Sequence, residues 1–544
     1  MSQLVDNTIK VFHTVKYLKP KQLFYQLYYR VNKLKHIESI PSGFAKWKWQ
    51  GPRLNEQSIL DESTVVFLNE EGKLEQSSDW NCQTKTKLWL YNLHYFDDLS
   101  SKDYTNRTEI HYNFISKWID ENPPCAGNGW EPYPTSLRLV NWVKWCSVQS
   151  SPKPHVLKSM LEQALVLEQQ LEYHILGNHL FANAKALVFV GTYLEGAVAA
   201  SLLKLGLKLL NQELKEQFLA DGAHFELSPM YHEILLWDLL ELIDLAKTSN
   251  NYSLMLHLNN WAAIAEKALS WLNSMLHPDE EISFFNDAAI GIAATPKDIY
   301  SYANKLGIKY LSAERALVTN SESGYSRVQN DKYTLLFDHA NVGPDYLPGH
   351  AHADTLSFEL SVGLHRFFVN SGTSLYGVSK ERLRQRSTSA HNTVTVCDEN
   401  SSEVWSGFRV ARRAYAKLLK TEQNADSIVL SACHDGYKRL KPKVVHTRTL
   451  EAKKAEIIVT DNLSHNSEAT FNLHIHPNVM VELLDNKTLA LKYSSQTVEL
   501  TTSHEIFVEK STWHPEFGKS VENKKITIPF NDGQLITKIK VIKE

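Results

Sequence analysis

The chain has 544 residues, of which 43% are hydrophobic and 22% are charged. This length predicts two to four domains with cores of ample size, and the composition is that of an ordinary globular protein. The formal net charge of −3 gives no basis for a nucleic-acid partner.

The first 50 residues are basic, with nine lysines and arginines against Asp6 and Glu38. An amphipathic helix in this region would most often dock on its own domain, so we expect residues 1–105 to form an extension that packs on the helical domain. The alternative is a weak contact of the basic N-terminus with a membrane surface or a partner. The apolar residues at helical spacing are Leu23, Phe24, Leu27, Tyr28 and Val31.

Targeting and redox signals are few. No secretory signal is visible, and no apolar stretch has the length and purity of a transmembrane segment. The five cysteines are widely spaced and form no CxxC motif, which predicts reduced thiols rather than a disulfide framework or a zinc knuckle. We therefore expect a cytoplasmic protein, with the periplasm as the alternative.

Along the rest of the chain, the spacing of the apolar residues changes once. Over residues 106–315 the apolar residues repeat at i, i+3 and i+4, and the short connections predict antiparallel helical hairpins. Residues 316–544 contain short alternating segments, such as LSFELSVG and ATFNLHIH, many of them separated by turn residues. This pattern predicts an antiparallel β-sandwich, so the expected fold is multidomain α+β.

Two motifs in the helical region place polar side chains at helix ends. Asn178 and His179 lie between two predicted helices, where they could project into a cleft. The alternative is an N-cap asparagine beside a surface histidine. Glu226 and Tyr231 belong to a loop-to-helix junction, FELSPMYHE. A tyrosine at a helix start can act as a general acid or base when its pKa is perturbed, and a packed aromatic residue is the alternative.

A third motif lies in the β-rich region. His350, His352 and Asp354 occupy alternate positions, so on an extended strand they share one face and can form part of a metal site or a general-base site. His391 is a natural third ligand, and Asn370 could approach from a neighbouring strand. No phosphate-binding loop or serine-hydrolase elbow is present, so we expect no nucleotide or organic cofactor.

Taken together and in this order, the motifs resemble the heparinase II/III-like family of polysaccharide lyases. The densest similarity lies in GNHLFANAKAL, FELSPMYHE, PGHAHADTLSFEL and RSTSAHNTV. The resemblance implies an (α/α) toroid of incomplete-barrel type over residues 106–315 and a C-terminal antiparallel β-sandwich over residues 316–544. It also implies an acidic polysaccharide substrate, cleaved at uronic acids by β-elimination.

This chemistry explains the residue types. Elimination removes the C5 proton of a uronate and expels the oxygen at C4, so the site needs a partner for the carboxylate, a base and an acid. By the resemblance, Asn178 holds the carboxylate with His179 nearby, and Tyr231 protonates the leaving oxygen and, depending on the stereochemistry of the substrate, also takes the C5 proton. His350 supports or performs proton abstraction. The other implied roles are orientation of the site or binding of an acidic group by Arg386, substrate binding by Glu226, Tyr376 and Arg138, and zinc binding by His352, Asn370 and His391.

Two departures from the family keep alternatives open. Members that bind zinc commonly have an aspartate where this chain has Asn370, and a neutral amide is a weaker ligand, so a hydrogen-bond cluster with His352 and His391 is the alternative to Zn²⁺. The absence of a visible export signal suggests a role in making or trimming the cell's own surface polysaccharide. Uronyl C5-epimerisation, which uses the same proton abstraction, and silent glycan binding are the competing functions.

Overall fold

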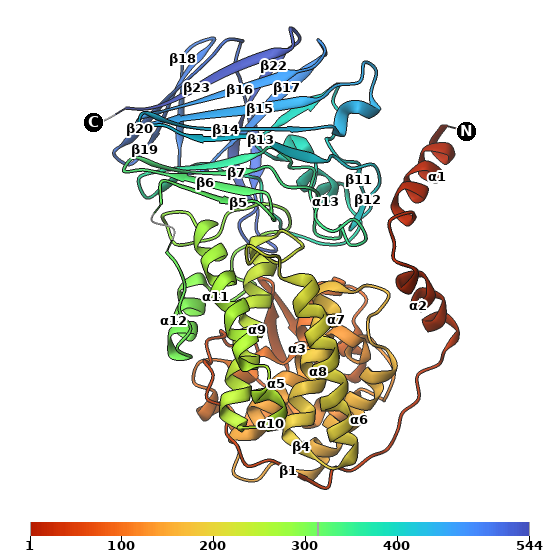
Figure 1. The fold of residues 1–544 in the computed structure, drawn as a ribbon. Helices are drawn as coiled ribbons and strands as arrows, with labels where there is room; N and C mark the ends of the chain where they lie inside the picture. Colours follow the sequence, from red (N-terminus) through yellow and green to blue (C-terminus); the bar gives the residue numbers. More distant parts are fainter. Residues whose placement is uncertain (1, 313–314, 543–544) are drawn as a thin grey trace.

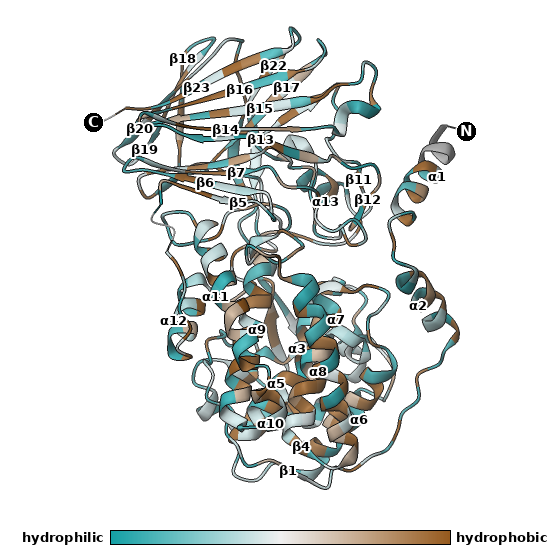
Figure 2. Ribbon diagram, in the orientation of Figure 1, coloured by the Kyte–Doolittle hydropathy of each residue, from teal (hydrophilic) through white to brown (hydrophobic). Residues whose placement is uncertain are grey.

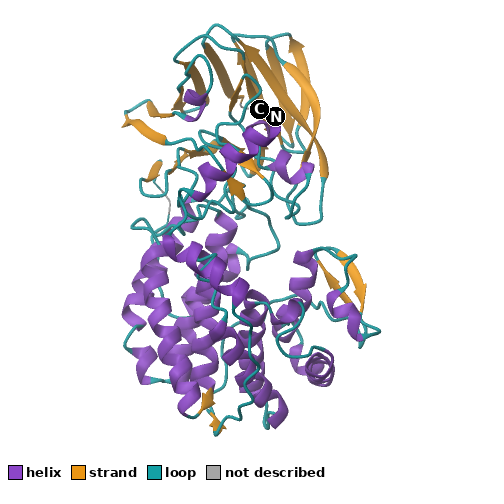
Figure 3. Cartoon of the chain, turned by 90° about the vertical axis from the view of Figure 1, so that its right-hand side faces the viewer, coloured by secondary structure: helices purple, strands orange, loops and turns teal. Residues whose placement is uncertain are grey.

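The computed structural model describes residues 2–312 and 315–542. Helices gather in one half of the molecule and strands in the other (Figure 1, Figure 3). The predicted multidomain α+β fold, an incomplete helical toroid followed by an antiparallel β-sandwich, is confirmed. Among the described helices, none combines the length and apolar character that crossing a membrane requires. The five cysteines are free thiols, as predicted.

The N-terminal helices lie along one side of the molecule (Figure 1). They are α1 (Ser2–Val15) and α2 (Pro20–Val31). The Gln22 amide of α2 donates to the carbonyl of Ile175 in the helical half at 3.4 Å and to that of Tyr346 in the other half at 3.2 Å. The opposite face of α2 remains in solvent, with Phe24 60% and Val31 81% exposed. Helix α2 therefore docks through polar contacts and through aromatic contacts such as that of Tyr25 with Tyr173, and it keeps an apolar face uncovered.

The helical half has one continuous apolar core (Figure 2). Trp49, Trp80 and Trp89 lie in this core, so the part of the chain from Trp49 to Trp89 contributes to it. Two short antiparallel strand pairs accompany the helices: β1 (Gly43–Phe44) with β4 (Leu194–Glu195), and β2 (Thr64–Phe67) with β3 (Glu70–Lys73). The helices are α3 (Lys87–Tyr95), α4 (Thr108–Glu121), α5 (Pro132–Val148), α6 (Pro154–Gln169), α7 (Gly177–Tyr193), α8 (Ala197–Gln217), α9 (Pro229–Ser249), α10 (Tyr252–Met255), α11 (Leu258–Ser274) and α12 (Pro296–Lys305).

Helix α7 occupies the centre of the helical half. It is buried along nearly its whole length and packs against α5, α6, α8 and α9, as a helix that is apolar on all sides must. Gly191 permits the close approach of α8, because a Cβ there would lie 2.6 Å from the carbonyl oxygen of Ala199. This packing fixes the axis of α7 and hence the position of its first turn.

The β-half contains two antiparallel sheets that enclose a second core. Strands β15 (His446–Lys453) and β16 (Glu456–Leu463) alternate strictly between buried and half-buried residues, which is the period of a sheet with one covered face. One sheet has the order β21-β22-β17-β9-β8-β7-β6-β5, with β10 also on β17, and the other β13-β14-β15-β16-β23-β20-β19-β18. The remaining bounds are β5 (Leu317–Asn320), β6 (Tyr325–Gln329), β7 (Tyr333–Asp338), β8 (Phe358–Val362), β9 (His365–Phe368), β10 (Val394–Val396), β11 (Val404–Trp405), β12 (Arg409–Val410), β13 (Ala416–Gln423), β14 (Ser427–His434), β17 (Ala469–Ile475), β18 (Met480–Asp485), β19 (Thr488–Tyr493), β20 (Gln496–Thr502), β21 (Phe507–Trp513), β22 (Val521–Phe530) and β23 (Gln534–Ile542).

Three irregular segments lie where the two halves meet (Figure 1). They are the segment 276–295 after α11, the β7–β8 connection 339–357, and the β9–β10 connection 369–393, which includes helix α13 (Lys380–Gln385). The backbone N–H of Asp287 donates to the carbonyl of His350 at 3.0 Å, so the first two segments are joined directly.

Candidate active site

Helix α7 presents its first turn toward the β-half (Figure 1). Gly177 has a φ of 57°, and a Cβ there would lie 2.8 Å from a carboxylate oxygen of Glu226, so glycine is required at this turn. The same oxygen of Glu226 accepts a hydrogen bond from the backbone N–H of Asn178 at 3.3 Å. The side-chain amide of Asn178 makes no hydrogen bond to any described residue, which leaves it available to a ligand.

His179 follows on the same turn. Its Nδ1 lies 2.9 Å from Oε1 of Glu172, and its ring lies 4.4 Å from the ring of Tyr133, centroid to centroid. Burial lowers the pKa of His179, but the charge of Glu172 and the hydrogen bond to it raise the pKa by more, so the net shift is upward from 6.5. The amide of Asn178 and an imidazole with a raised pKa are thus neighbours at one helix start.

Helix α9 begins in the same region and carries Tyr231 in its first turn. The hydroxyl of Ser228 caps this helix by accepting from the N–H of Tyr231 at 3.2 Å. The Tyr231 ring stacks on the ring of His350 with centroids 3.8 Å apart, and its hydroxyl lies 3.0 Å from the hydroxyl of Tyr376. Burial, followed by the neighbouring Tyr376, holds the pKa of Tyr231 well above 10, so its phenol carries a proton at neutral pH.

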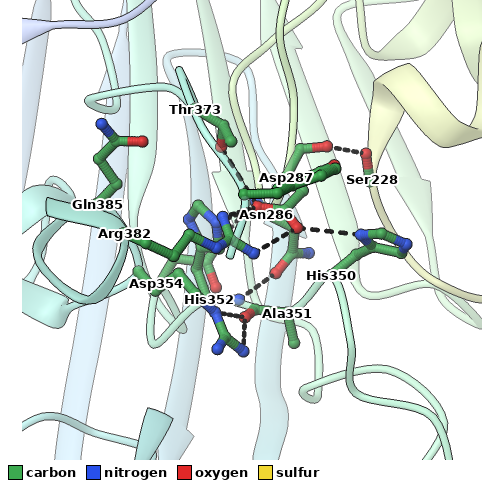
Figure 4. A network of polar contacts seen from close by, with 12 residues as sticks. Ser228, Asn286, Asp287, His350, Ala351, His352, Asp354, Thr373, Arg382 and Gln385 are labelled. Atoms are coloured by element: carbon green, nitrogen blue, oxygen red, sulfur yellow. Dashed lines mark hydrogen bonds and ion pairs between the residues drawn. The ribbon is translucent and has the colours of Figure 1, made fainter. Parts of the chain in front are cut away.

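Asp287 lies at the centre of the polar network (Figure 4). Its carboxylate contacts Nδ1 of His350 at 3.0 Å and Nε2 of His352 at 2.8 Å, and it pairs with both terminal nitrogens of Arg382, one of them at 2.7 Å. Burial raises the pKa of Asp287, but Arg382 and the two histidines outweigh burial and hold the pKa well below 3.8. A fully buried carboxylate therefore connects the stacked His350 to the histidine pair behind it.

The sequence did not predict a role for Asp287 or Arg382. Asp287 belongs to the segment FFNDAAIG, which carries neither helical nor strand periodicity. Arg382 lies four residues before Arg386, and both contribute to the region between the two halves. The one local signal was the three arginines in ERLRQR, and only the position of each side chain in the structure tells which of them reaches the carboxylate.

The predicted metal ligands are close together but engaged with one another. Nδ1 of His352 lies 3.1 Å from Nε2 of His391, and Asn370 Oδ1 accepts from the backbone N–H of Asn392 at 3.2 Å. Burial lowers the pKa of His352 to about 4, so the ring is neutral. A protein zinc site needs at least three ligand atoms directed at one point. Within the described residues no group of three or more His, Cys, Asp or Glu side chains has metal-binding geometry, whereas Nδ2 of Asn370 is buried without a hydrogen-bond partner, so zinc binding by His352, Asn370 and His391 stays a prediction.

Arg138 was expected to bind substrate and Arg386 to orient the site or bind an acidic group, but both side chains are fully buried, so neither binding role is possible. Arg386 is fully buried and donates to the carbonyl of Ala351 at 2.8 and 3.0 Å, so it holds the His350–His352 segment from behind. Arg138 is fully buried in the helical core, where it donates to Gln163 at 2.8 Å and stacks on Trp118 at 3.9 Å. Both arginines stabilise the fold and neither can touch a substrate.

The other candidate residues are arranged around the Tyr231–His350 pair. Glu226 is buried, and its second carboxylate oxygen lies 3.5 Å from Nε2 of His350. Tyr376 is half-buried and packs against Phe517. Asp354 is buried away from the stacked pair and accepts the N–H of Asn286 at 2.9 Å, which makes it structural.

Comparison with known proteins agrees with this architecture. Residues 76–306 match the family described as Heparinase II/III N-terminus, and residues 314–542 match Heparinase II/III-like, C-terminal. The chain is 25% identical over 374 residues, or 63% of its length, to a heparin-sulfate lyase of Bacteroides stercoris, and 25% identical over 406 residues, or 65% of its length, to one of Bacteroides thetaiotaomicron. It spans 53% and 55% of these two relatives, about half of each.

Solved structures share the fold. A crystal structure of heparinase III superposes with a TM-score of 0.71 at 18% identity, covering 85% of this chain and 79% of that one. A heparan sulfate lyase from Pedobacter heparinus superposes with a TM-score of 0.59 at 16% identity, covering 96% and 88%.

Proposed function

Because the chain belongs to the heparinase II/III-like family, we propose that it is a polysaccharide lyase that cleaves a uronic-acid-containing polysaccharide by β-elimination. The observation that carries the proposal is the stack of Tyr231 on His350, with the Tyr376 hydroxyl at 3.0 Å from that of Tyr231. A proton donor and a proton acceptor are thereby held side by side, next to an unpaired amide.

In the proposed reaction, His350 takes the C5 proton of the uronate. Its Nδ1 is bonded to Asp287, so the lone pair of the neutral ring lies on Nε2. The electron pair of the C5–H bond becomes the C4=C5 double bond, and the C4–O bond breaks. The leaving oxygen takes the proton of the Tyr231 phenol, which is neutral at pH 7 because burial raises its pKa. Return of a proton from His350 to Tyr231 restores both groups.

The C5 proton becomes acidic only when the carboxylate charge of the uronate is offset. The free amide of Asn178 supplies this partner in the proposed complex, together with the ring of His179, whose raised pKa favours the charged form. Glu226 would repel an anionic sugar if it were ionised. Burial raises the pKa of Glu226, which favours the neutral acid next to the substrate.

The names of the relatives direct the choice of substrate toward heparan sulfate-type glycosaminoglycans. On mixing the protein with heparan sulfate, we expect a rise in ultraviolet absorbance from the unsaturated uronate. A panel of other uronic-acid polysaccharides, read in the same way, would identify a different substrate within the class. Deuterium incorporation at C5 from heavy water, without chain cleavage, would contradict elimination and favour epimerisation.

The pH dependence of substrate affinity is expected to follow His179. Its pKa lies above 6.5, so the ring is charged below that raised pKa and becomes neutral as the pH rises through it. We therefore expect KM for the polysaccharide to increase on the alkaline side of this pKa. Glu172→Gln removes the carboxylate that raises the pKa, so the increase in KM should move to lower pH.

The measurement is KM against pH for the wild type and for Glu172→Gln. A matched control is Glu168→Gln, which removes the same charge from an exposed position on the neighbouring helix α6. Identical profiles for the Glu172→Gln variant and the wild type would contradict a role for the His179 charge in binding.

A further inference from the structure

A groove of about 600 Å³ lies in the β-half, apart from the residues of the candidate active site. Its walls come from β17, β21 and β22 and from the segment that follows Arg382. Four cationic side chains line it, and one carboxylate, that of Glu522. The four are Arg384, Lys510, Lys524 and Lys525.

Two of these cations face each other without a counter-ion. Lys510 on β21 and Lys524 on β22 are direct partners across the two strands. Like charges in directly opposite positions destabilise a sheet. Neither lysine forms an ion pair with any described residue. An anion placed between them would relieve this repulsion.

Each of the other two cations already has a carboxylate partner. Lys525 lies 3.4 Å from a carboxylate oxygen of Glu509, and Arg384 lies 2.6 Å from one of Glu381. The carboxylates that face the groove or its cations are therefore Glu381, Glu509 and Glu522, and the unbalanced positive charge is that of the lysine pair.

Neutral hydrogen-bonding groups complete the lining. His474 and His476 face the groove region, and burial lowers their pKa values to about 3 and about 4, so both rings are uncharged. The Asn523 side chain and the hydroxyls of Ser511 and Thr512 are further lining groups. Lysines combined with neutral amide, imidazole and hydroxyl groups suit a ligand that carries both anionic and hydroxyl groups.

The groove is connected to the candidate active site by a short stretch of chain. Helix α13 supplies Arg382 to the Asp287 network, and Arg384, two residues later, to the groove. The next residues lead past Ser389, whose carbonyl bonds Nε2 of His474 at 2.9 Å, to His391. The same short segment of chain thus contributes residues both to the groove and to the candidate active site, the two places at which a polymer could be engaged.

We propose that this groove binds an anionic stretch of the polysaccharide outside the catalytic centre, with a sulfate or carboxylate between Lys510 and Lys524. The inference rests on the proposed function for its ligand class, an acidic polysaccharide. The groove then acts as an accessory subsite that favours long chains over short ones.

The test is the affinity of the protein for heparan sulfate chains, measured by titration calorimetry at low ionic strength. The protein carries the Tyr231→Phe substitution so that the chains stay intact. Adding Lys510→Ser and Lys524→Ser is expected to weaken binding about fivefold or more, and to make it less dependent on salt, because two exposed charge contacts are lost. Adding Lys538→Ser and Lys540→Ser instead removes equal charge from exposed positions on β23 in the other sheet and is the matched control.

Unchanged affinity in the Lys510/Lys524 variant would overturn the proposal and leave the lysines with the role of protecting the edge strand β21 from pairing. An equal loss in the control would also overturn it, since net charge alone would then explain the effect. With Tyr231 intact, cleavage of a short oligosaccharide should be unaffected by the groove substitutions. If no uronic-acid polysaccharide is cleaved but groove-dependent binding is observed, the proposed function fails and the groove assignment stands.

Discussion

Replacing Tyr231 by phenylalanine is expected to lower kcat at least about 100-fold, because the leaving oxygen then loses its proton donor. Burial keeps the Tyr231 phenol protonated, and its ring stacks on that of His350 with centroids 3.8 Å apart. The phenyl ring can keep its stack on His350, so the Kd for heparan sulfate should change little. Initial rates of the absorbance rise at saturating substrate, with the Kd from calorimetry, separate the two quantities.

The control for this substitution is Tyr300→Phe, on helix α12. Tyr300 is partly buried, and its hydroxyl donates to the carbonyl of Leu269 at 3.3 Å, so the change removes an equivalent hydroxyl away from the candidate site. We expect that variant to keep the wild-type rate. If Tyr231→Phe retained kcat within about threefold of the wild type, the proton donor would have to be another group, and Tyr376 would be the first to test.

The fold was predictable from the sequence because its signals are periodic. Helical spacing over residues 106–315 and alternation over residues 316–544 each reflect which side chains meet a core. The periodic pattern could not show that Trp49 and Trp80 enter the helical core, because they lie in an irregular segment whose burial is decided by tertiary packing. It also could not show that α2 contacts both halves through one glutamine.

The candidate site was predictable where chemistry follows a local geometric signal. Asn178 and Tyr231 lie at helix starts, as the sequence predicted. His350 was expected on an extended strand but lies in the loop before β8, so the alternation of His350, His352 and Asp354 does not mark a strand face. Asp287 gives no such signal, since its importance comes from contacts with residues 63 and 95 positions away. The resemblance implied a substrate contact for Arg138, whereas its side chain is enclosed by Trp118 and Gln163. Burial depth is a property of the assembled core, and one sequence does not specify it.

Asp287→Asn is expected to have the second large effect, on both activity and stability. The substitution leaves the guanidinium of Arg382 buried without its counter-charge, and breaking a buried ion pair in this way costs about 3–5 kcal/mol in the free energy of unfolding. The pKa of Asp287 is held well below 3.8, so this stabilisation is present at pH values above that ordinary carboxyl value and is lost as the pH falls through the lowered pKa. His350 also loses the carboxylate that fixes its ring, so kcat should fall about 100-fold or more. KM should stay nearly constant, because Asp287 is fully buried and does not touch the substrate.

The β-half contains a matched control for this experiment. Asp461 is equally buried, pairs with Arg448 at 2.8 and 3.0 Å, and accepts a hydrogen bond from His446 at 2.7 Å, so it has the same kinds of partner. Asp461→Asn should therefore lower the free energy of unfolding by a similar amount, measured by urea denaturation. Its kcat, measured on folded protein well below the melting temperature, should remain close to that of the wild type, because neither His350 nor Tyr231 contacts Asp461. A parallel fall of kcat in both variants would mean that Asp287 acts through stability alone. A fall confined to Asp287→Asn would identify this carboxylate as the positioning residue for His350.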